Sequence, residues 1–99
     1  MAREGRAADR PRREAAEDQG AALSERLVEE LARRLVDRPD EVRVERGERD
    51  GVAVLRLHVA PDDVGKVIGR QGRIARALRT LVRASAARTH ERVHLDIVD

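Results

Sequence analysis

The stretch Val67-Ile68-Gly69-Arg70-Gln71-Gly72-Arg73-Ile74 decides how we interpret this chain. Two glycines enclose a basic and a polar residue, an apolar pair precedes them, and an amphipathic helical pattern follows. A backbone without Cβ atoms can approach a ligand closely, and the N-terminus of the following helix presents N–H groups and the positive end of the helix dipole. The stretch therefore predicts a turn that can hold an anion such as a phosphate group.

The glycine turn lies in a part of the chain that carries only positive charge. Residues 65–88 contain no Asp or Glu and seven cations, which are Lys66, Arg70, Arg73, Arg76, Arg79, Arg83 and Arg88. Residues 39–64 hold seven acids against four cations, whereas residues 65–99 hold eight cations against three acids. The net charge is only +2, but residues 65–99, which contain the turn, are strongly basic. This positive charge favours a phosphate backbone as the partner.

The composition indicates one small domain with a tail. Residues 1–20 hold five Arg, five Asp or Glu and no Leu, Ile or Val, so they cannot bury enough apolar surface to offset the entropy of ordering. We predict that they form a disordered charged tail. Residues 21–99 hold all 24 Leu, Val and Ile residues and are predicted to form the domain. Phe, Tyr and Trp are absent, which limits the area that each core residue can bury.

The composition also excludes several classes of protein. Without cysteine there is neither a disulfide nor a thiolate zinc site, and a cytoplasmic location is expected. The tail lacks the apolar region of a signal peptide, and no apolar run reaches the length of a membrane span. P-loop spacing, a dinucleotide-binding glycine pattern and a nucleophile beside a base are all missing. We therefore expect a binding protein rather than an enzyme, with no cofactor, metal, membrane or small-molecule substrate.

Apolar periodicity predicts the order helix, strand, strand, helix, helix, strand. The expected elements are a helix through 23–36 that ends before Pro39, strands at 42–46 and 52–60 joined by a turn at 47–51, helices at 61–68 and 72–89 on either side of the glycine turn, and a last strand at 93–97. We expect an α+β fold in which three helices lie on one face of a three-stranded sheet. The long crossover between the second and third strands permits parallel pairing.

The helix after the glycine turn is predicted to have an apolar and a basic side. Its expected core face consists of Ile74, Ala77, Leu78, Leu81, Val82 and Ser85. Arg76, Arg79 and Arg83 lie nearly opposite that face, and Arg73 lies at the edge nearest the turn. Because arginine is common throughout the chain, these side chains are open to two interpretations, a phosphate-binding surface or a solvated helix face.

The residues 67–74 resemble the Val-Ile-Gly-x-x-Gly-x-x-Ile signature of a KH domain, with one residue fewer between the second glycine and the last isoleucine. The predicted α-β-β-α-α-β order is similar to the type II KH arrangement of bacteria. The run from Gly65 to Arg79 and the short single domain resemble the KhpA-like family of single-KH RNA-binding proteins over residues 23–99. The resemblance implies single-stranded RNA as the partner and a role as RNA chaperone or post-transcriptional regulator. It also implies a homodimer or a heterodimer with a KhpB-like KH protein, and effects on cell division, cell shape and cell wall biogenesis.

The expected RNA-binding site is centred on the glycine turn. Its predicted members are Gly69, Arg70, Gln71, Gly72, Lys66, Arg73, Arg76, Ile68 and Ile74. The cations would contact neighbouring phosphates, and the two isoleucines would line an apolar groove for the bases. A KH loop of this kind clamps four backbone nucleotides. Without aromatic side chains the protein cannot stack bases as an OB-fold does, so its base discrimination should be modest.

Each of these assignments has an alternative. Gly-x-x-Gly can be a plain turn between helices, Lys66 and Arg70 can be merely solvated, and the isoleucines can belong to the core. His58, His90 and His94 are explained by surface positions and show no spacing of metal ligands. At the level of function the alternative is a dimerisation or adaptor protein that acts through protein contacts. A stable dimer that ignores RNA at low salt would favour that alternative.

Overall fold

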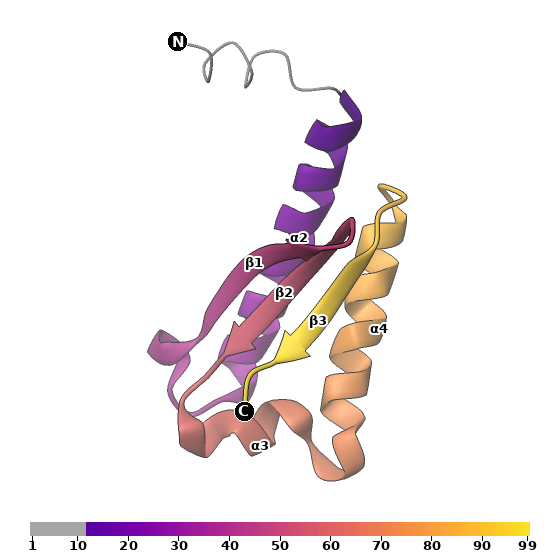
Figure 1. Cartoon of the computed structure of the whole chain (residues 1–99). Helices are drawn as coiled ribbons and strands as arrows, with labels where there is room; N and C mark the ends of the chain where they lie inside the picture. Colours follow the sequence, from indigo (N-terminus) through magenta and orange to yellow (C-terminus); the bar gives the residue numbers. More distant parts are fainter. Residues whose placement is uncertain (1–11) are drawn as a thin grey trace, which may run out of the picture.

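The computed structural model describes residues 12–99, and the first eleven residues lie outside this range (Figure 1). Along the chain the helices and strands are α2 (Arg12–Leu35), β1 (Arg43–Arg49), β2 (Val52–His58), α3 (Val64–Ile68), α4 (Arg73–Ala87) and β3 (Val93–Ile97). Three short 3-10 turns, at Pro39–Glu41, Pro61–Asp63 and Arg70–Gly72, connect them. This is the α-β-β-α-α-β order that the apolar pattern predicted, and it is consistent with a type II KH fold.

Helix α2 begins earlier in the chain than the leucine pattern alone indicates. The pattern starts at Leu23, but the helix starts at Arg12 and its first turns project beyond the sheet (Figure 1). The sequence between these points is rich in Ala and Glu, which have high helix propensity. The helix ends before Pro39, as predicted. The disordered tail was predicted over residues 1–20, of which residues 12–20 lie in α2; residues 1–11 lie outside the described part of the chain.

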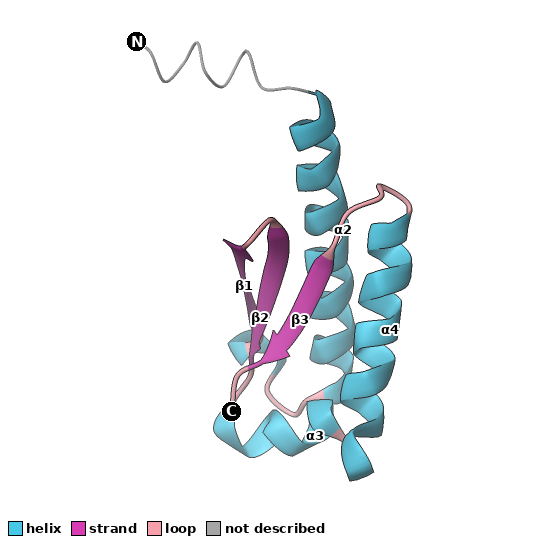
Figure 2. Cartoon of the chain, turned by 45° about the vertical axis from the view of Figure 1, so that its right-hand side comes forward, coloured by secondary structure: helices cyan, strands magenta, loops and turns pink. Residues whose placement is uncertain are grey.

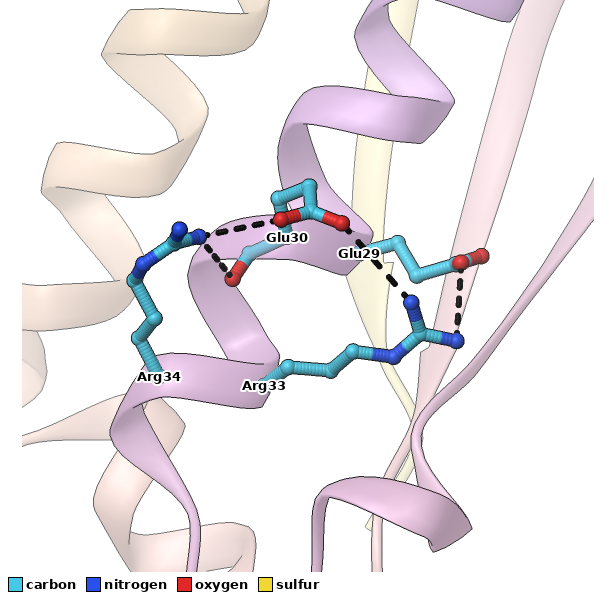
Figure 3. A network of polar contacts seen from close by, with 4 residues as sticks. All are labelled: Glu29, Glu30, Arg33 and Arg34. Atoms are coloured by element: carbon cyan, nitrogen blue, oxygen red, sulfur yellow. Dashed lines mark hydrogen bonds and ion pairs between the residues drawn. The ribbon is translucent and has the colours of Figure 1, made fainter.

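The solvated side of α2 neutralises its own charges. Arg33 Nη2 lies 3.0 Å from Glu29 Oε1, and Arg34 Nη1 lies 3.0 Å from Glu30 Oε2. A longer contact of 3.8 Å joins Arg33 to Glu30, so the four residues form one network on the helix surface (Figure 3). These are the i,i+3 and i,i+4 pairs that a helix brings together, each of modest energy. The charges of Arg33 and Arg34 are therefore balanced locally.

The strands form one mixed sheet in the order β1-β2-β3. Strands β1 and β2 are antiparallel, with Arg49 opposite Val52, so only Asp50 and Gly51 form the turn. Both turn residues have positive φ, 53° and 80°, which is typical of a two-residue hairpin. The predicted five-residue turn at 47–51 was wrong, because Gly47 lies within β1 opposite Val54.

Strand β3 is parallel to β2 and forms an edge of the sheet. Leu55 lies opposite Leu95, and Ala53 lies opposite Val93. The crossover between these strands contains α3 and α4, so the parallel pairing expected from the long connection is confirmed. Helices α2 and α4 lie side by side behind the sheet, and α3 closes one end (Figure 2).

The core lies between the sheet and the helices. Leu55, Leu57 and Val67 are fully buried, together with Val28 of α2 and Val82 of α4. The predicted core face of α4 was partly wrong. Its buried residues are Ala75, Leu78, Val82 and Ala86, whereas Ala77 and Leu81 are exposed. Helix α4 packs on β3 as well as on α2, and its buried stripe is rotated relative to the predicted one.

Candidate nucleic-acid interface

The Gly-x-x-Gly turn connects α3 to α4 at the end of the molecule that α3 closes (Figure 1). Three of its four residues have positive φ: Gly69 at 79°, Gln71 at 58° and Gly72 at 73°. A Cβ on Gly69 would lie 2.7 Å from Ile74 Cγ1 and 2.9 Å from the Ile74 nitrogen. Gly69 is therefore required both by its conformation and by lack of space. At Gly72 a Cβ would meet nothing within 4 Å, so only the conformation favours glycine.

Backbone hydrogen bonds hold this turn in shape. The N–H of Gly69 donates to the carbonyl oxygen of Gly65 at 2.8 Å, and the N–H of Gly72 donates to that of Gly69 at 3.1 Å. No side chain caps the N-terminus of α4. The positive end of the dipole of this 15-residue helix therefore stays open beside the turn, where an anion would be stabilised.

Gln71 links two of the predicted phosphate contacts to the turn. Arg73 Nη2 donates to Gln71 Oε1 at 3.3 Å, and Arg76 Nη2 approaches the Gln71 carbonyl oxygen at 3.5 Å. The left-handed conformation of Gln71 presents both acceptors to α4. The structure thus brings Arg73 and Arg76 to the turn, while the Gln71 amide nitrogen remains available as a donor.

Several arginines at and after the turn lack carboxylate partners of the kind that Arg33 and Arg34 have in α2. Within residues 12–99, the following make no ion pair and have exposed side chains: Arg70, Arg73, Arg76, Arg79 and Arg83. Their positive charge is not neutralised by the protein. This is the arrangement expected of a surface that binds a polyanion.

Lys66 is the exception among the predicted cations. Its Nζ lies 3.3 Å from Asp37 Oδ2 and 3.5 Å from Asp63 Oδ1. The hydrogen bond to Asp37, with the charge of that carboxylate, raises the pKa of Lys66. The lysine is therefore cationic but already paired, and a phosphate would have to share it with two carboxylates.

Asp63 anchors this end of the molecule. It is 1% exposed, and its two oxygens accept the backbone N–H groups of Asp37 at 3.2 Å and of Arg38 at 3.1 Å. Burial alone would raise the pKa of Asp63, but those hydrogen bonds and Lys66 outweigh it and lower the pKa below the ordinary value. The carboxylate ties the residues after α2 to the start of α3, and α3 leads directly into Gly69.

The two predicted apolar contacts are half-buried. Ile74 packs against the core and lies against Gly69, and Ile68 is the last residue of α3. Both flank the turn. Part of each surface remains accessible to a ligand, so core packing and base contact are compatible for these residues.

Sequence reasoning did not identify Asp63 or Asp37, and it left Arg79 open between a phosphate-binding surface and a solvated helix face. Asp63 makes no side-chain cap at the start of α3, and its carboxylate instead accepts hydrogen bonds from N–H groups 25 and 26 residues back along the chain. Arg79 donates from Nε to the Leu95 carbonyl oxygen at 3.2 Å, so its side of α4 faces β3. Arg79 follows Gly72 by seven residues, close to two helical turns, and this spacing could have indicated that both lie on the same side of α4.

Two further findings limit the kinds of site. In the part of the chain that the structure describes, no group of three or more His, Asp or Glu side chains could hold a metal ion. None of the helices between residues 12 and 99 combines the length and the apolar character needed to cross a membrane.

Comparison with known proteins gives a consistent result. The family model described as KhpA/KhpB, KH domain matches residues 25–97. A protein of Treponema pallidum named RNA-binding protein KhpA is 53% identical over 77 residues, covering 78% of this chain and 96% of that protein. Proteins of the same name from Halalkalibacterium halodurans and Borreliella burgdorferi are 52% and 51% identical over 73 residues, covering 74% of this chain and 96% and 89% of those proteins. No solved structure matches the chain significantly.

Proposed function

Because the chain belongs to the KhpA/KhpB family of KH domains, we propose that it binds single-stranded RNA through the backbone of its Gly-x-x-Gly turn. The relatives are named for RNA binding and not for a reaction, which agrees with the expectation of a binding protein rather than an enzyme. A role as RNA chaperone or post-transcriptional regulator in the cytoplasm belongs to the same proposal.

One observation carries the proposal: an open helix N-terminus and a glycine turn lie among arginines that have no carboxylate partner. The turn supplies close backbone approach at Gly69 and Gly72, and Arg70 extends from it. Arg73 and Arg76 flank it through Gln71. Phosphates would be held by charge and backbone N–H groups, and bases would lie on the exposed parts of Ile68 and Ile74. Such a site grips the RNA backbone with little sequence preference.

The decisive experiment is a double substitution, Arg70→Asp with Gln71→Asp, followed by titration of a labelled single-stranded RNA. We expect binding to be abolished while the circular dichroism spectrum is unchanged. A suitable control is Arg26→Asp with Gly47→Asp, which changes the net charge equally at two exposed positions away from the turn. The control should bind RNA nearly as well as the wild-type protein.

The salt dependence tests the same contact independently. If three or four phosphates are neutralised, log K should fall against log salt with a slope near −2 to −3, at about 0.7 per phosphate. Between 50 and 200 mM salt the affinity should then fall about 15- to 60-fold. Unchanged affinity in the double variant, with the fold intact, would contradict the proposal.

A second candidate function is self-association or pairing with a KhpB-like KH protein. Leu23 of α2 is 53% exposed and Leu81 of α4 is 43% exposed. The two helices are neighbours, joined by the hydrogen bond from Ser24 to Ser85, and each leucine lies within four residues of one of these serines. Light scattering after size exclusion tests this, with Leu23→Ser plus Leu81→Ser expected to weaken any dimer. A dimer that persists in this variant would place the contact elsewhere.

A further inference from the structure

We propose that β1, a free edge of the sheet, pairs with β1 of a second copy of this chain around a two-fold axis at Gly47. This inference goes beyond the proposed function, because the contact uses neither the glycine turn nor the exposed leucines of α2 and α4. In the part of the chain that the structure describes, β1 pairs with β2 on one side and with no strand on the other (Figure 1). A strand with a free edge is a template for pairing with another chain.

The hydrogen bonds of the sheet show which backbone groups of β1 face outward. In β2 the N–H of Ala53 and the carbonyl oxygen of Leu57 bond to residues that flank β3, so the odd-numbered residues of β2 turn their backbone groups toward β3. The even-numbered residues of β2 therefore bond to β1, where their partners are the odd-numbered residues. Because these groups alternate in direction along a strand, the remaining ones of β1 face the free edge. They belong to Val44, Arg46 and Glu48.

The charges of β1 allow one extended two-fold register with a second copy. A two-fold antiparallel pair places one residue directly opposite its own copy. Five of the seven residues of β1 are charged, and an axis at any of these five would bring like charges together, which is destabilising. The two uncharged residues are Val44 and Gly47. An axis at Val44 would overlap only residues 43–45 of the strand, whereas an axis at Gly47 overlaps residues 45–49.

With the axis at Gly47, the charged residues that face each other have opposite signs. Glu45 of each copy lies opposite Arg49 of the other copy. Arg46 lies opposite Glu48, and the outward backbone groups of these two residues form the hydrogen bonds between the strands. Opposite charges directly across two strands stabilise their pairing. Charges on an edge strand oppose pairing with unrelated chains, but this arrangement favours one partner, which is the same strand of a second copy.

Two of these side chains also have ionic partners within their own chain. Arg46 Nε lies 3.7 Å from Glu25 Oε1. Glu45 lies 2.6 Å from His58 Nε2 through Oε1 and 3.6 Å from Arg43 Nη1 through Oε2. The hydrogen bond with His58 lowers the pKa of Glu45, which keeps this carboxylate charged at neutral pH. A guanidinium has five N–H donors and a carboxylate accepts several hydrogen bonds, so each side chain can serve a second partner across the edge.

The experiment uses single cysteines, because the chain has none of its own. In the proposed pair the two Gly47 residues face each other with Cα atoms about 4.5 Å apart, a separation that a disulfide can span. A Cβ at this position meets nothing within 4 Å, so the substitution fits the folded chain. We expect Gly47→Cys to form a disulfide-linked dimer under mild oxidation at least about 10-fold faster than the control Arg43→Cys, which is exposed on the same strand but lies far from its own copy.

Charge exchange tests the register. An acidic edge is made by Arg46→Glu plus Arg49→Glu, and a basic edge by Glu45→Arg plus Glu48→Arg, each combined with Gly47→Cys. Each variant alone should form the disulfide about 10-fold more slowly, because like charges then face each other. An equal mixture should recover the original rate and yield the mixed dimer, identified by its intact mass. Circular dichroism checks that both variants remain folded.

Four results would overturn the inference. Equal rates for Gly47→Cys and Arg43→Cys would indicate random collision, and rates that ignore both charge variants would exclude the register. Loss of the disulfide when Leu23→Ser plus Leu81→Ser is added would assign the contact to the helices. No disulfide from Gly47→Cys at any protein concentration would leave the edge to a strand of a different protein. Failure of RNA binding would not affect the test, because its readout contains no RNA.

Discussion

Replacing Gly69 by alanine tests the geometry of the glycine turn. Gly69 has φ 79° and ψ 170°, a backbone region that is essentially restricted to glycine. A Cβ there would also lie 2.9 Å from both Cβ and the backbone nitrogen of Ile74, well inside normal contact. Gly72 shares the positive φ, at 73°, but has open space around it. The two substitutions therefore separate backbone strain from steric conflict.

The expected magnitudes follow from these two terms. Backbone strain of this kind costs about 1–3 kcal/mol, and forcing an extra carbon into packed space costs about 1–3 kcal/mol more. Gly69→Ala should thus lower the free energy of unfolding by roughly 2–6 kcal/mol. Gly72→Ala should lower it by only about 1–2 kcal/mol, the cost of a left-handed conformation at a non-glycine residue. Since 1 kcal/mol corresponds to about 4–8 °C in Tm for a domain of this size, Gly69→Ala should lower Tm by about 8 °C or more.

Urea unfolding followed by far-ultraviolet circular dichroism measures these differences. Protein concentration must be held constant, because self-association would add to the apparent stability. Gly47→Ala is the control, since Gly47 lies in β1 with nothing within 4 Å of the added Cβ. It should raise the free energy of unfolding by about 0.4–1 kcal/mol. Equal losses for Gly69→Ala and Gly72→Ala would refute the argument that Ile74 closes the space over the first glycine.

Three further predictions concern the core and the acidic partners of the site. Leu78→Ala, at 3% exposure, should cost about 2–5 kcal/mol in urea unfolding, whereas Leu81→Ala should cost well under half as much; equal costs would contradict the observed face of α4. The folded-state pKa of Asp63 lies below its ordinary value, so its ionised form stabilises the fold above that value and this stability is lost as the pH falls through the folded pKa. Urea midpoints between pH 5 and pH 2 should therefore fall less steeply in Asp63→Asn, which starts less stable at pH 7; parallel curves would exclude this carboxylate as a source of acid lability. Asp37→Asn removes a carboxylate 3.3 Å from Lys66 Nζ and should tighten RNA binding about 2- to 3-fold, while unchanged affinity would show that Lys66 does not reach the strand.

The order of elements and the strand pairing could be predicted because they follow from local patterns. Apolar alternation identifies a strand, and a crossover with two helices permits only a limited set of pairings. The length of the hairpin turn was harder to predict from the sequence. Gly47 and Gly51 both resemble turn residues, but the Asp50-Gly51 pair matches the tight turn that a twisted hairpin prefers, and that preference decided the register.

The buried face of α4 could not be predicted from apolar periodicity alone. In a helix with so many alanines, small apolar residues occupy several sides, and the apolar pattern alone does not choose among them. Tertiary packing buries the side that carries Ala75, Leu78, Val82 and Ala86. Leu81 was left exposed as a consequence, although it is one of the most apolar residues of the helix.

The site could be predicted where it depends on neighbours in sequence, and could not where it depends on tertiary contacts. The glycines, the arginines around them and the following helix are adjacent in the chain, and their positions followed from the motif. The ion pairing of Lys66 did not follow from the motif. Its partner Asp37 is 29 residues away and contacts it only when α3 packs beside the end of α2. Asp63 depends on the same packing.

Whether the protein itself neutralises an arginine therefore has a local cause. In α2 each arginine at positions 33 and 34 follows a glutamate by three or four residues, so helix formation alone neutralises it. From residue 65 to residue 88 there is no acid, so helix formation in α4 places Arg76, Arg79 and Arg83 in a row that no local carboxylate can neutralise. Only tertiary structure could supply a carboxylate to these cations. Among the cations of residues 65–88 in the described part of the chain, Lys66 alone receives one. The positive surface beside the turn is thus a consequence of which residue types alternate along one helix, and it persists as long as that helix forms.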